Sequence, residues 1–343
     1  MSSDATITVS GFILAGNYPE DDPASGLESV LQLIEHGEAL GYQVAGVRQR
    51  HLERGISSAL PFLGAASQRT SRIRLETDVV ALGHETPFRL AEDFATVDAL
   101  SGGRLNVGVS TSAPHSELLS ALARPDADEE TDRYGLIDRF LDALEGRPLA
   151  SEHIATPYGP QTPRVQPHVE GLRDRVWLGG GSDRSIRWAA ERGLRLLLGN
   201  VTSGNGSQPF EQVQRAQIDD YHARFTGSDS SVGVERVIVP CDGATTAQRA
   251  HYEAYAESRL ERTKHTATIG DRRVIFQRDL IGSAEEIVDR LASDPAFDGR
   301  TQLRVALPYG FAQGEYRQIL ESIAELVLPP LGWRARSEQP VAA

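Results

Sequence analysis

The stretch RVWLGGGSDRSIRWAAERGLRLLLG, residues 175–199, places a strand, a helix and a second strand in direct succession. Its first apolar run ends in three glycines, and its last apolar run has the length of a buried strand. The polar segment between them predicts a helix that begins near Ser182 and ends at Gly193. This order is typical of a parallel sheet whose neighbouring strands are joined by helices.

The same order repeats along the whole chain, which has 343 residues. Eight strands are predicted, each followed by a helix, and several are continuous apolar runs, as expected when both faces of a parallel sheet are buried. They cover residues 7–15, 42–47, 71–82, 104–110, 175–180, 194–199, 232–240 and 301–308. The pattern predicts a single (β/α)₈ TIM barrel over residues 1–335, with a frayed tail at 336–343. A doubly wound sheet is the alternative, but no G-x-G-x-x-G follows the first strand.

Four longer segments interrupt this regular order, at residues 112–131, 148–173, 202–208 and 261–279. Long loops in a compact domain usually serve as lids or binding elements. We therefore expect loop insertions at the C-terminal face of the strands, where barrel enzymes bind their substrates.

Composition excludes several classes of function. The net charge is −13 and no run of Lys or Arg occurs, so no nucleic-acid partner is expected. No apolar stretch is long enough to span a membrane, and a cytoplasmic location is predicted. The single cysteine, Cys241, is predicted to be a buried apolar residue, and the scattered histidines predict no metal site. Asp98 and Arg104 are expected to form a buried structural pair.

Candidate catalytic residues follow the second predicted strand. His51 has an ordinary pKa near neutrality, which suits proton transfer, although a structural contact beside a helix is the alternative. Arg50 could hold an anion or pair with a nearby carboxylate such as Glu53. The third strand ends in Ala81 and Leu82, which are candidates to border a ligand.

Two other strand ends suit a ligand rather than a reaction. Gly108 and Ser110 are small, which leaves room for a large flat molecule close to the backbone. The fifth strand runs through glycines into a helix, and unpaired amides at a helix N-terminus form an anion site. This candidate phosphate site consists of Gly180, Gly181, Ser182, Arg184 and Ser185. In the alternative interpretation, Ser182 is simply a helix cap.

Three blocks carry a resemblance to a known family. They are IRLETDVVALGHETPFRLAEDFATVDALSGGRLNVGV at residues 73–109, the stretch at 175–199, and IGSAEEIVDRL at 281–291. Over about residues 7–331 the chain resembles the bacterial luciferase-like flavin-dependent monooxygenases. The resemblance implies reduced FMN, or a deazaflavin coenzyme, with its phosphate at residues 180–185. It also implies a ring against the ends of the third and fourth strands, and a non-proline cis peptide near Ala81 and Leu82. A closing loop at 261–279 and a homodimer through the helices after strands two and three are implied as well.

The function that this resemblance implies is a two-component monooxygenase, in which a separate flavin reductase supplies reduced FMN and a small organic substrate is oxidised by O₂. His51 and Arg50 are its predicted catalytic residues, with Arg50 standing where the light-emitting members have a histidine. One alternative is hydride transfer with a deazaflavin, in which His51 acts as acid or base. The other is a flavin-binding protein without activity.

Overall fold

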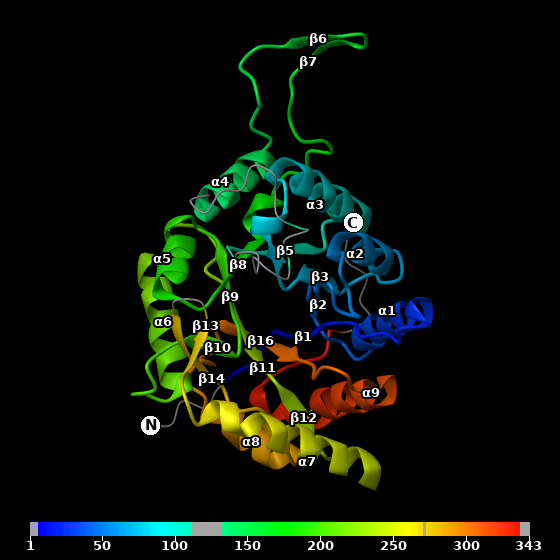
Figure 1. Cartoon of the computed structure of the whole chain (residues 1–343), viewed down its shortest axis with the longest axis vertical. Helices are drawn as coiled ribbons and strands as arrows, with labels where there is room; N and C mark the ends of the chain where they lie inside the picture. Colours follow the sequence, from blue (N-terminus) through cyan, green and yellow to red (C-terminus); the bar gives the residue numbers. More distant parts are fainter. Residues whose placement is uncertain (1–5, 112–118, 120–121, 123–131, 270–271, 337–343) are drawn as a thin grey trace.

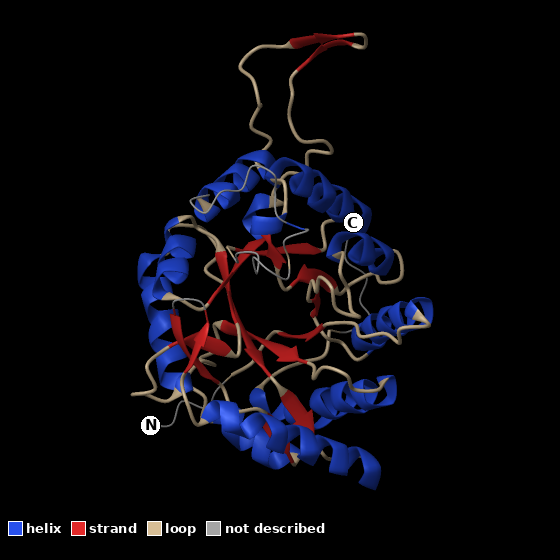
Figure 2. Ribbon diagram, viewed as in Figure 1, coloured by secondary structure: helices blue, strands red, loops and turns tan. Residues whose placement is uncertain are grey.

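Eight parallel strands close into a barrel in the computed structural model, which describes residues 6–111, 119, 122, 132–269 and 272–336. The strands pair in the order β3, β2, β1, β16, β11, β9, β8, β5, and β3 pairs with β5 to close the ring (Figure 2). They are β1 Ser10–Leu14, β2 Val44–Val47, β3 Arg74–Thr77, β5 Leu105–Ser110, β8 Val176–Gly180, β9 Arg195–Leu198, β11 Val232–Arg236 and β16 Thr301–Ala306. The predicted (β/α)₈ barrel is therefore confirmed, and the doubly wound sheet is wrong.

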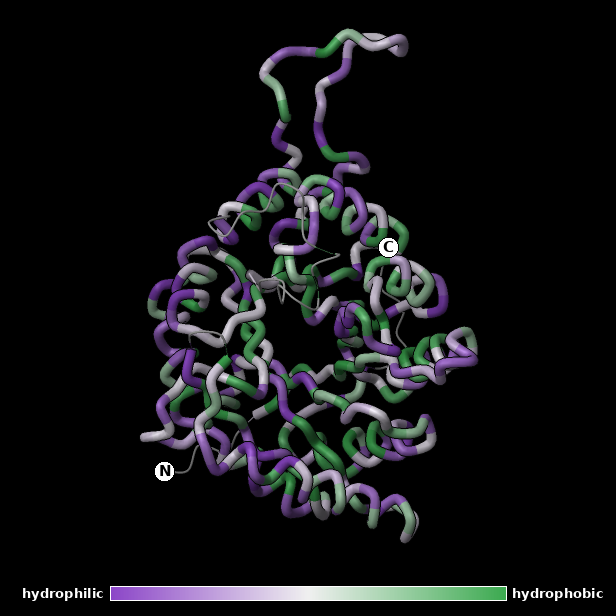
Figure 3. Tube along the Cα trace, in the orientation of Figure 1, coloured by the Kyte–Doolittle hydropathy of each residue, from purple (hydrophilic) through white to green (hydrophobic). Residues whose placement is uncertain are grey.

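Helices surround the barrel on its outside (Figure 1). They are α1 Pro23–Ala39, α2 Ala59–Ser67, α3 Pro87–Ser101, α4 Arg133–Leu144, α5 Asp183–Glu191, α6 Phe210–Arg224, α7 Thr246–Leu260, α8 Ala284–Ala292 and α9 Gln313–Ser322. Hydrophobic and hydrophilic residues alternate along these helices (Figure 3), because one face packs on the strands and the other meets solvent. Among the described residues, no helix is long and apolar enough to cross a membrane.

The turn between α3 and β5 shows how local sequence positions a strand. Gly102 and Gly103 have φ values of 67° and 81°, a conformation that glycine adopts without steric cost, so α3 ends there. Arg104 then donates to four main-chain carbonyls, including those of Ser67 and Ile73. The predicted pair between Asp98 and Arg104 is wrong.

Asp98 pairs instead with Arg175, at 2.6 Å, at the start of β8. Both side chains are largely buried, and the Asp98 carboxylate also accepts a hydrogen bond from the Leu105 amide. Arg104 and Arg175 both lie near the turn between α3 and β5. Arg104 satisfies its donors on carbonyls, which leaves the Asp98 carboxylate to Arg175.

A buried layer of polar side chains fills the middle of the barrel. Side chains at alternate positions of an extended chain point to the same face, so Glu76 of β3 and Asp78, which follows β3, both face the barrel lumen. Glu76 forms an ion pair with Arg304 of β16 at 2.8 Å, and both are fully buried. Asn106 donates to the same carboxylate, and Arg304 lies over the Trp177 ring. This layer separates the two ends of the barrel.

Short strands outside the barrel occupy most of the longer segments. β6 (Ile154–Thr156) and β7 (Gly159–Gln161) form a hairpin that projects from the body beyond α3 and α4 (Figure 1). β10 (Val201–Ser203), β14 (Arg272–Phe276) and β13 (Ala267–Ile269) form an antiparallel sheet, and β12 (Ile238–Pro240) pairs with β15 (Leu280–Gly282). β4 (Val80–Ala81) extends β3 along β5.

These strands refine the predicted insertions. The segment at 261–279, expected to be a loop, contributes two strands to a sheet with β10. The segment at 148–173 follows α4 and precedes β8, so it lies at the N-terminal end of the barrel, and its predicted place at the C-terminal face of the strands is wrong. The predicted strand at 232–240 is divided into β11 and β12. The segment at 112–131 and the tail at 337–343 lie outside the described residues, except for residues 119 and 122.

Candidate active site at the carboxyl ends of the strands

The two predicted catalytic residues have different partners. Arg50 donates to the Tyr309 hydroxyl, lies over the Tyr309 ring and is 3.7 Å from Glu53. His51 contacts Gln49, with 3.0 Å between the two Nε2 atoms, and its ring lies edge-on to that of His84. Burial lowers the pKa of His51, which favours its neutral form. The structure therefore does not bring Arg50 and His51 together, and their catalytic roles stay predictions.

The ends of β3, β4 and β5 form a closely packed floor. A Cβ atom on Gly108 would lie 1.8 Å from the carbonyl oxygen of Thr77, so the main chain of β3 fills the space that we expected to be open. Leu82 is fully buried, and Ala81 is half-buried opposite the largely buried Ser110 of β5. Ala81 and Ser110 border the strand ends, whereas the Leu82 side chain belongs to the core.

A non-proline cis peptide joins Asp78 to Val79. The prediction placed it near Ala81 and Leu82, and this position is wrong by about three residues. The bond comes directly after β3, where the Val79 side chain lies against both Gly108 and Gly179, so that a Cβ on either glycine would be 3.1–3.2 Å from it. The floor is thus built from Val79 and the two glycines that accommodate it.

The glycine-rich exit of β8 leads into α5 as predicted. Ser182 is the N-cap of α5 and forms a capping box with Ser185, which engages the Ser182 and Ser185 amides. The first amides of a helix have no partner within it, and those of Asp183 and Arg184 remain for an anion. A Cβ on Gly180 would be 2.9 Å from the Ser185 hydroxyl, and one on Gly181 would be 3.2 Å from the Val201 carbonyl. The predicted cap and the predicted anion site therefore share one helix terminus.

Tyr134, which the sequence did not single out, lies beside Arg184 of this terminus. The Arg184 guanidinium lies over the ring of Tyr134, 4.8 Å from its centroid. Burial raises the pKa of Tyr134, while Arg184, a hydrogen bond to Thr111 and the charge of Arg272 oppose the shift. Arg184 and Arg272 thus both lie near Tyr134. Tyr134 and Arg272 come from distant segments, so their spacing in the sequence carried no signal.

A charged layer closes the upper end of the barrel lumen, one step above the Glu76–Arg304 pair. It consists of Arg48, which follows β2, Asp78, which follows β3, and Glu235 of β11. Arg48 Nη2 contacts Glu235 Oε2 and is 3.9 Å from Asp78 Oδ2. Asp78 and Glu235 carry no signal in the sequence, because both lie within segments predicted only as strands.

A ligand entering at the strand ends would meet this layer first. Only Arg48 retains appreciable exposure, since the Asp78 and Glu235 side chains are 3% and 7% exposed. The α5 terminus offers donors for a phosphate beside it, so the residues present fit a flavin-like molecule with an anionic tail and a flat polar head. Within the described part of the chain, no three His, Cys, Asp or Glu side chains cluster as metal ligands do.

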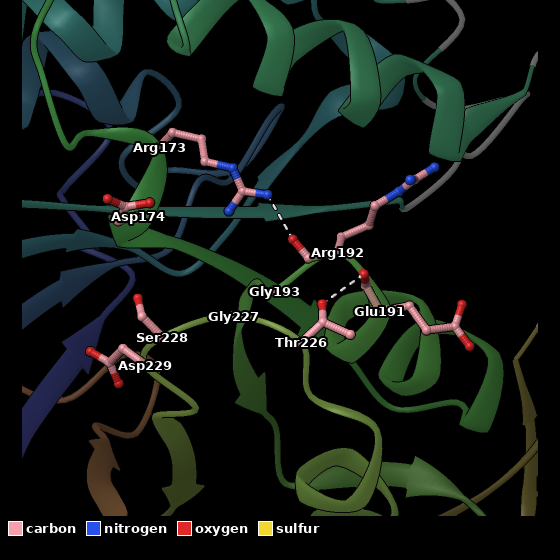
Figure 4. Close-up of a pocket in the computed structure, with 9 residues that line it drawn as sticks. All are labelled: Arg173, Asp174, Glu191, Arg192, Gly193, Thr226, Gly227, Ser228 and Asp229. Carbon is pink, nitrogen blue, oxygen red and sulfur yellow. Dashed lines mark hydrogen bonds between the residues drawn. The ribbon is translucent and has the colours of Figure 1, made fainter.

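Two hollows lie outside the barrel lumen. One, of about 370 Å³, is lined by residues that precede β8, β9 and β11, including Arg173, Glu191 and Asp229, and so opens at the N-terminal end of the barrel (Figure 4). Residues on its opposite sides form hydrogen bonds with each other. Arg173 donates to the Arg192 carbonyl, and the Thr226 hydroxyl donates to the Glu191 carbonyl. The other, of about 520 Å³, runs between α2 and α3 and is also lined by Gln49, His51 and Glu85, which follow β2 and β4, so the predicted catalytic His51 borders it.

Comparison with known proteins identifies the family. The family model described as luciferase-like monooxygenase matches residues 7–296. The chain belongs to the luciferase-like monooxygenase family. One relative in this family, N-acetyl-S-alkylcysteine monooxygenase of Bacillus subtilis, is 26% identical over 204 residues, which are 56% of each chain.

Two solved structures share the fold. The oxygenating constituent of 3,6-diketocamphane monooxygenase from Pseudomonas putida, in complex with FMN, has a TM-score of 0.66 at 15% identity and covers 95% of this chain and 98% of its own. Coenzyme F420-dependent tetrahydromethanopterin reductase from Methanopyrus kandleri also has a TM-score of 0.66, at 17% identity, covering 96% and 99%. At these identities the likeness demonstrates the barrel, and the luciferase-like membership rests on the family match.

Proposed function

We propose that this protein is a flavin-dependent monooxygenase that uses reduced FMN and O₂ to oxidise a small organic substrate. The observation that carries the proposal is the α5 terminus, where two helix amides and Arg184 lie beside the polar strand ends. The FMN complex of 3,6-diketocamphane monooxygenase shares the barrel, and N-acetyl-S-alkylcysteine monooxygenase shares the family. Both support an oxygenase.

Different residues would bind the cofactor phosphate, support its ring and keep water from the site. The Asp183 and Arg184 amides, with the Arg184 guanidinium, would hold the phosphate through charge-assisted hydrogen bonds. Val79 and the layer of Arg48, Asp78 and Glu235 would support the ring. Bound reduced flavin would supply the electrons that activate O₂, which is chemistry that no side chain provides. The sheet of β10, β14 and β13 stands beside the strand ends and could keep water from them.

Hydride transfer with a deazaflavin coenzyme is the second candidate, because coenzyme F420-dependent tetrahydromethanopterin reductase has the same barrel. Both cofactors present a phosphate and a flat ring, so the same residues would bind either one. Oxygen consumption distinguishes them, since only the monooxygenase takes up O₂ in step with substrate.

We further propose two partners. A separate flavin reductase would deliver reduced FMN, and a second copy of the chain would pack on α2 and α3. A cytoplasmic location is consistent with the need for a supply of reduced cofactor.

Titration of the protein with FMN, reduced FMN and the deazaflavin coenzyme, followed by protein fluorescence, tests the proposal. Arg184→Ala should weaken FMN binding about tenfold or more, because one charge-assisted contact is lost. Riboflavin, which lacks the phosphate, should bind both proteins equally. Arg187→Ala is the matched control, since Arg187 lies one turn further along α5 and pairs with Asp220. Absence of binding to all three cofactors would refute the proposal, as would equal FMN affinity in Arg184→Ala.

A further inference from the structure

The upper layer of the lumen contains one more carboxyl group than its cation can neutralise. β3 and β11 are opposite each other in the ring of eight strands, so Asp78 and Glu235 reach the same point from opposite walls. Among the residues that the structure describes, Arg48 is the cation that contacts both. Glu76, in the layer below, is already paired with Arg304, and the Tyr309 side chain also lies near Arg48. Two carboxyl groups therefore share one guanidinium.

The two carboxyl groups are not equivalent. Glu235 makes the close contact with Arg48, whereas Asp78 Oδ2 stays 3.9 Å from it. Asp78 Oδ2 is buried and accepts no hydrogen bond from any residue that the structure describes. A hydrogen bond between the Asp78 and Glu235 carboxyl groups requires a proton on one of them. A buried ionised oxygen without a donor is strongly disfavoured, whereas a neutral carboxyl group is tolerated much better. Geometry thus assigns the negative charge to Glu235 and a proton to Asp78.

Electrostatics points in the same direction. Burial and the neighbouring Glu235 carboxylate raise the pKa of Asp78 well above its ordinary value, and Arg48 only partly opposes the shift. Glu76 adds to the increase. An acid whose pKa lies nearer neutrality is better suited to proton transfer than an ordinary aspartate.

We propose that Asp78 is the acid of this site: it carries a proton at neutral pH and donates it to an oxygen or nitrogen atom of the molecule bound at the strand ends. In that step the carboxyl O–H bond breaks and the new bond forms on the acceptor. The carboxylate left on Asp78 is stabilised by Arg48, and solvent restores the proton after product leaves. The inference rests on the proposed function in placing a substrate at this end of the barrel, and an oxygenase or a hydride-transfer enzyme could use the same acid.

Two isosteric variants test the assignment without cofactor. While Asp78 keeps its proton in the folded chain and loses it in the unfolded chain, the free energy of unfolding falls as pH rises above about 4. Asp78→Asn should remove this part of the pH dependence. Glu235→Gln should reduce it, because Asp78 then faces Arg48 without a competing carboxylate. An unchanged pH dependence in Asp78→Asn would overturn the assignment.

Turnover tests the catalytic part. Asp78→Asn should lower kcat by about 100-fold or more while changing flavin affinity less than about threefold, since loss of a general acid affects the chemical step. Glu235→Gln should move the alkaline limb of the pH–rate profile to lower pH. Asp138→Asn, at a surface pair with Arg192, is the control and should keep the wild-type kcat. Wild-type turnover in Asp78→Asn would overturn the proposal.

Failure of every protein to bind flavin would instead refute the proposed function. The unfolding measurements would still decide whether Asp78 is protonated.

Discussion

Gly108 shows how a single missing side chain positions the strand ends. Thr77 and Val79 occupy the space beside its Cα, and the Thr77 hydroxyl bonds to both the amide and the carbonyl of Gly108. The two strands approach each other more closely than any side chain would permit. This approach brings Val79 across to β8 and fixes the floor beneath the candidate site.

Gly108→Ala should therefore destabilise the fold. Its Cβ would overlap a main-chain oxygen at 1.8 Å, and overpacking of this kind costs about 3 kcal/mol or more. Gly314→Ala is the matched control, because no atom lies within 4 Å of its Cβ in helix α9, and it should gain up to about 1 kcal/mol. Urea denaturation measures both. Equal stabilities would mean that β3 and β5 are further apart than the structure shows.

His51 gives a pH dependence opposite in sign to that of Asp78. Because burial lowers its pKa in the folded chain, the unfolded chain takes up a proton first as pH falls below about 6.5. Stability from neutral His51 is fully present above that pH and is lost as pH falls through the folded-state pKa.

His51→Gln should consequently lose less unfolding free energy than the wild type between pH 7 and pH 5. Thermal or urea unfolding at several pH values measures the difference. His153→Gln, at an exposed position, controls for the number of histidines and should follow the wild type. If His51→Gln loses as much stability as the wild type, its imidazole is not desolvated.

At the scale of elements, the barrel could be predicted because each strand is a buried apolar run between polar helices. Residues 175–199 contain this contrast in its clearest form, and β8, α5 and β9 lie where it placed them. The hairpins could not be predicted in the same way. β6 and β7 contain Pro160 and mostly exposed side chains. The two strands pair with each other and do not pack on the core, so no pattern of buried residues marks them.

The candidate site was predictable only where one segment supplies it. The α5 terminus follows from consecutive residues, so a single motif indicated it. The layer of Arg48, Asp78 and Glu235 comes from three strands that are far apart in sequence, and only the order of strands in the closed ring brings them together. Asp98 illustrates the same limit, because its true partner, Arg175, is 77 residues away.

The projecting hairpin should be dispensable for the stability of the barrel. Its base is closed by the hydrogen bond from Leu149 to the Pro163 carbonyl, and its tip residue Tyr158 is 90% exposed. Replacing residues 150–162 by a short Gly-Ser turn should change the free energy of unfolding by less than about 1 kcal/mol, since an isolated hairpin is marginally stable. Val165→Ala is the control for sensitivity. This residue is buried next to the hairpin, and the substitution should lower the free energy of unfolding by about 2 kcal/mol. A large decrease in the free energy of unfolding on deletion would mean that the hairpin stabilises the barrel.

At the scale of the whole molecule, the hollow between α2 and α3 is the surface most suited to a second copy. It is lined by small and apolar residues such as Ala59, Leu60, Gly64 and Val97, and Leu100 at its edge is 56% exposed. Small residues let helices approach closely, and a two-fold axis would set the same surface of both copies against each other. Charged residues at the rim, such as Arg89 and Asp93, pair with each other and can remain solvated.

Leu100→Glu should therefore convert a dimer into a monomer, because the contact would bury an unpaired charge against its own copy across the two-fold axis. Light scattering over a range of concentrations should give the wild type about twice the chain mass of 37.3 kDa and the variant about one chain mass. Leu326→Glu, at a side chain of similar exposure beyond α9, is the control and should stay dimeric. Each variant should keep the wild-type urea midpoint at monomer-forming dilution, so that loss of the dimer is not loss of the fold. A monomeric wild type, or a dimeric Leu100→Glu, would exclude α2 and α3 as the contact and leave the barrel complete as a single chain.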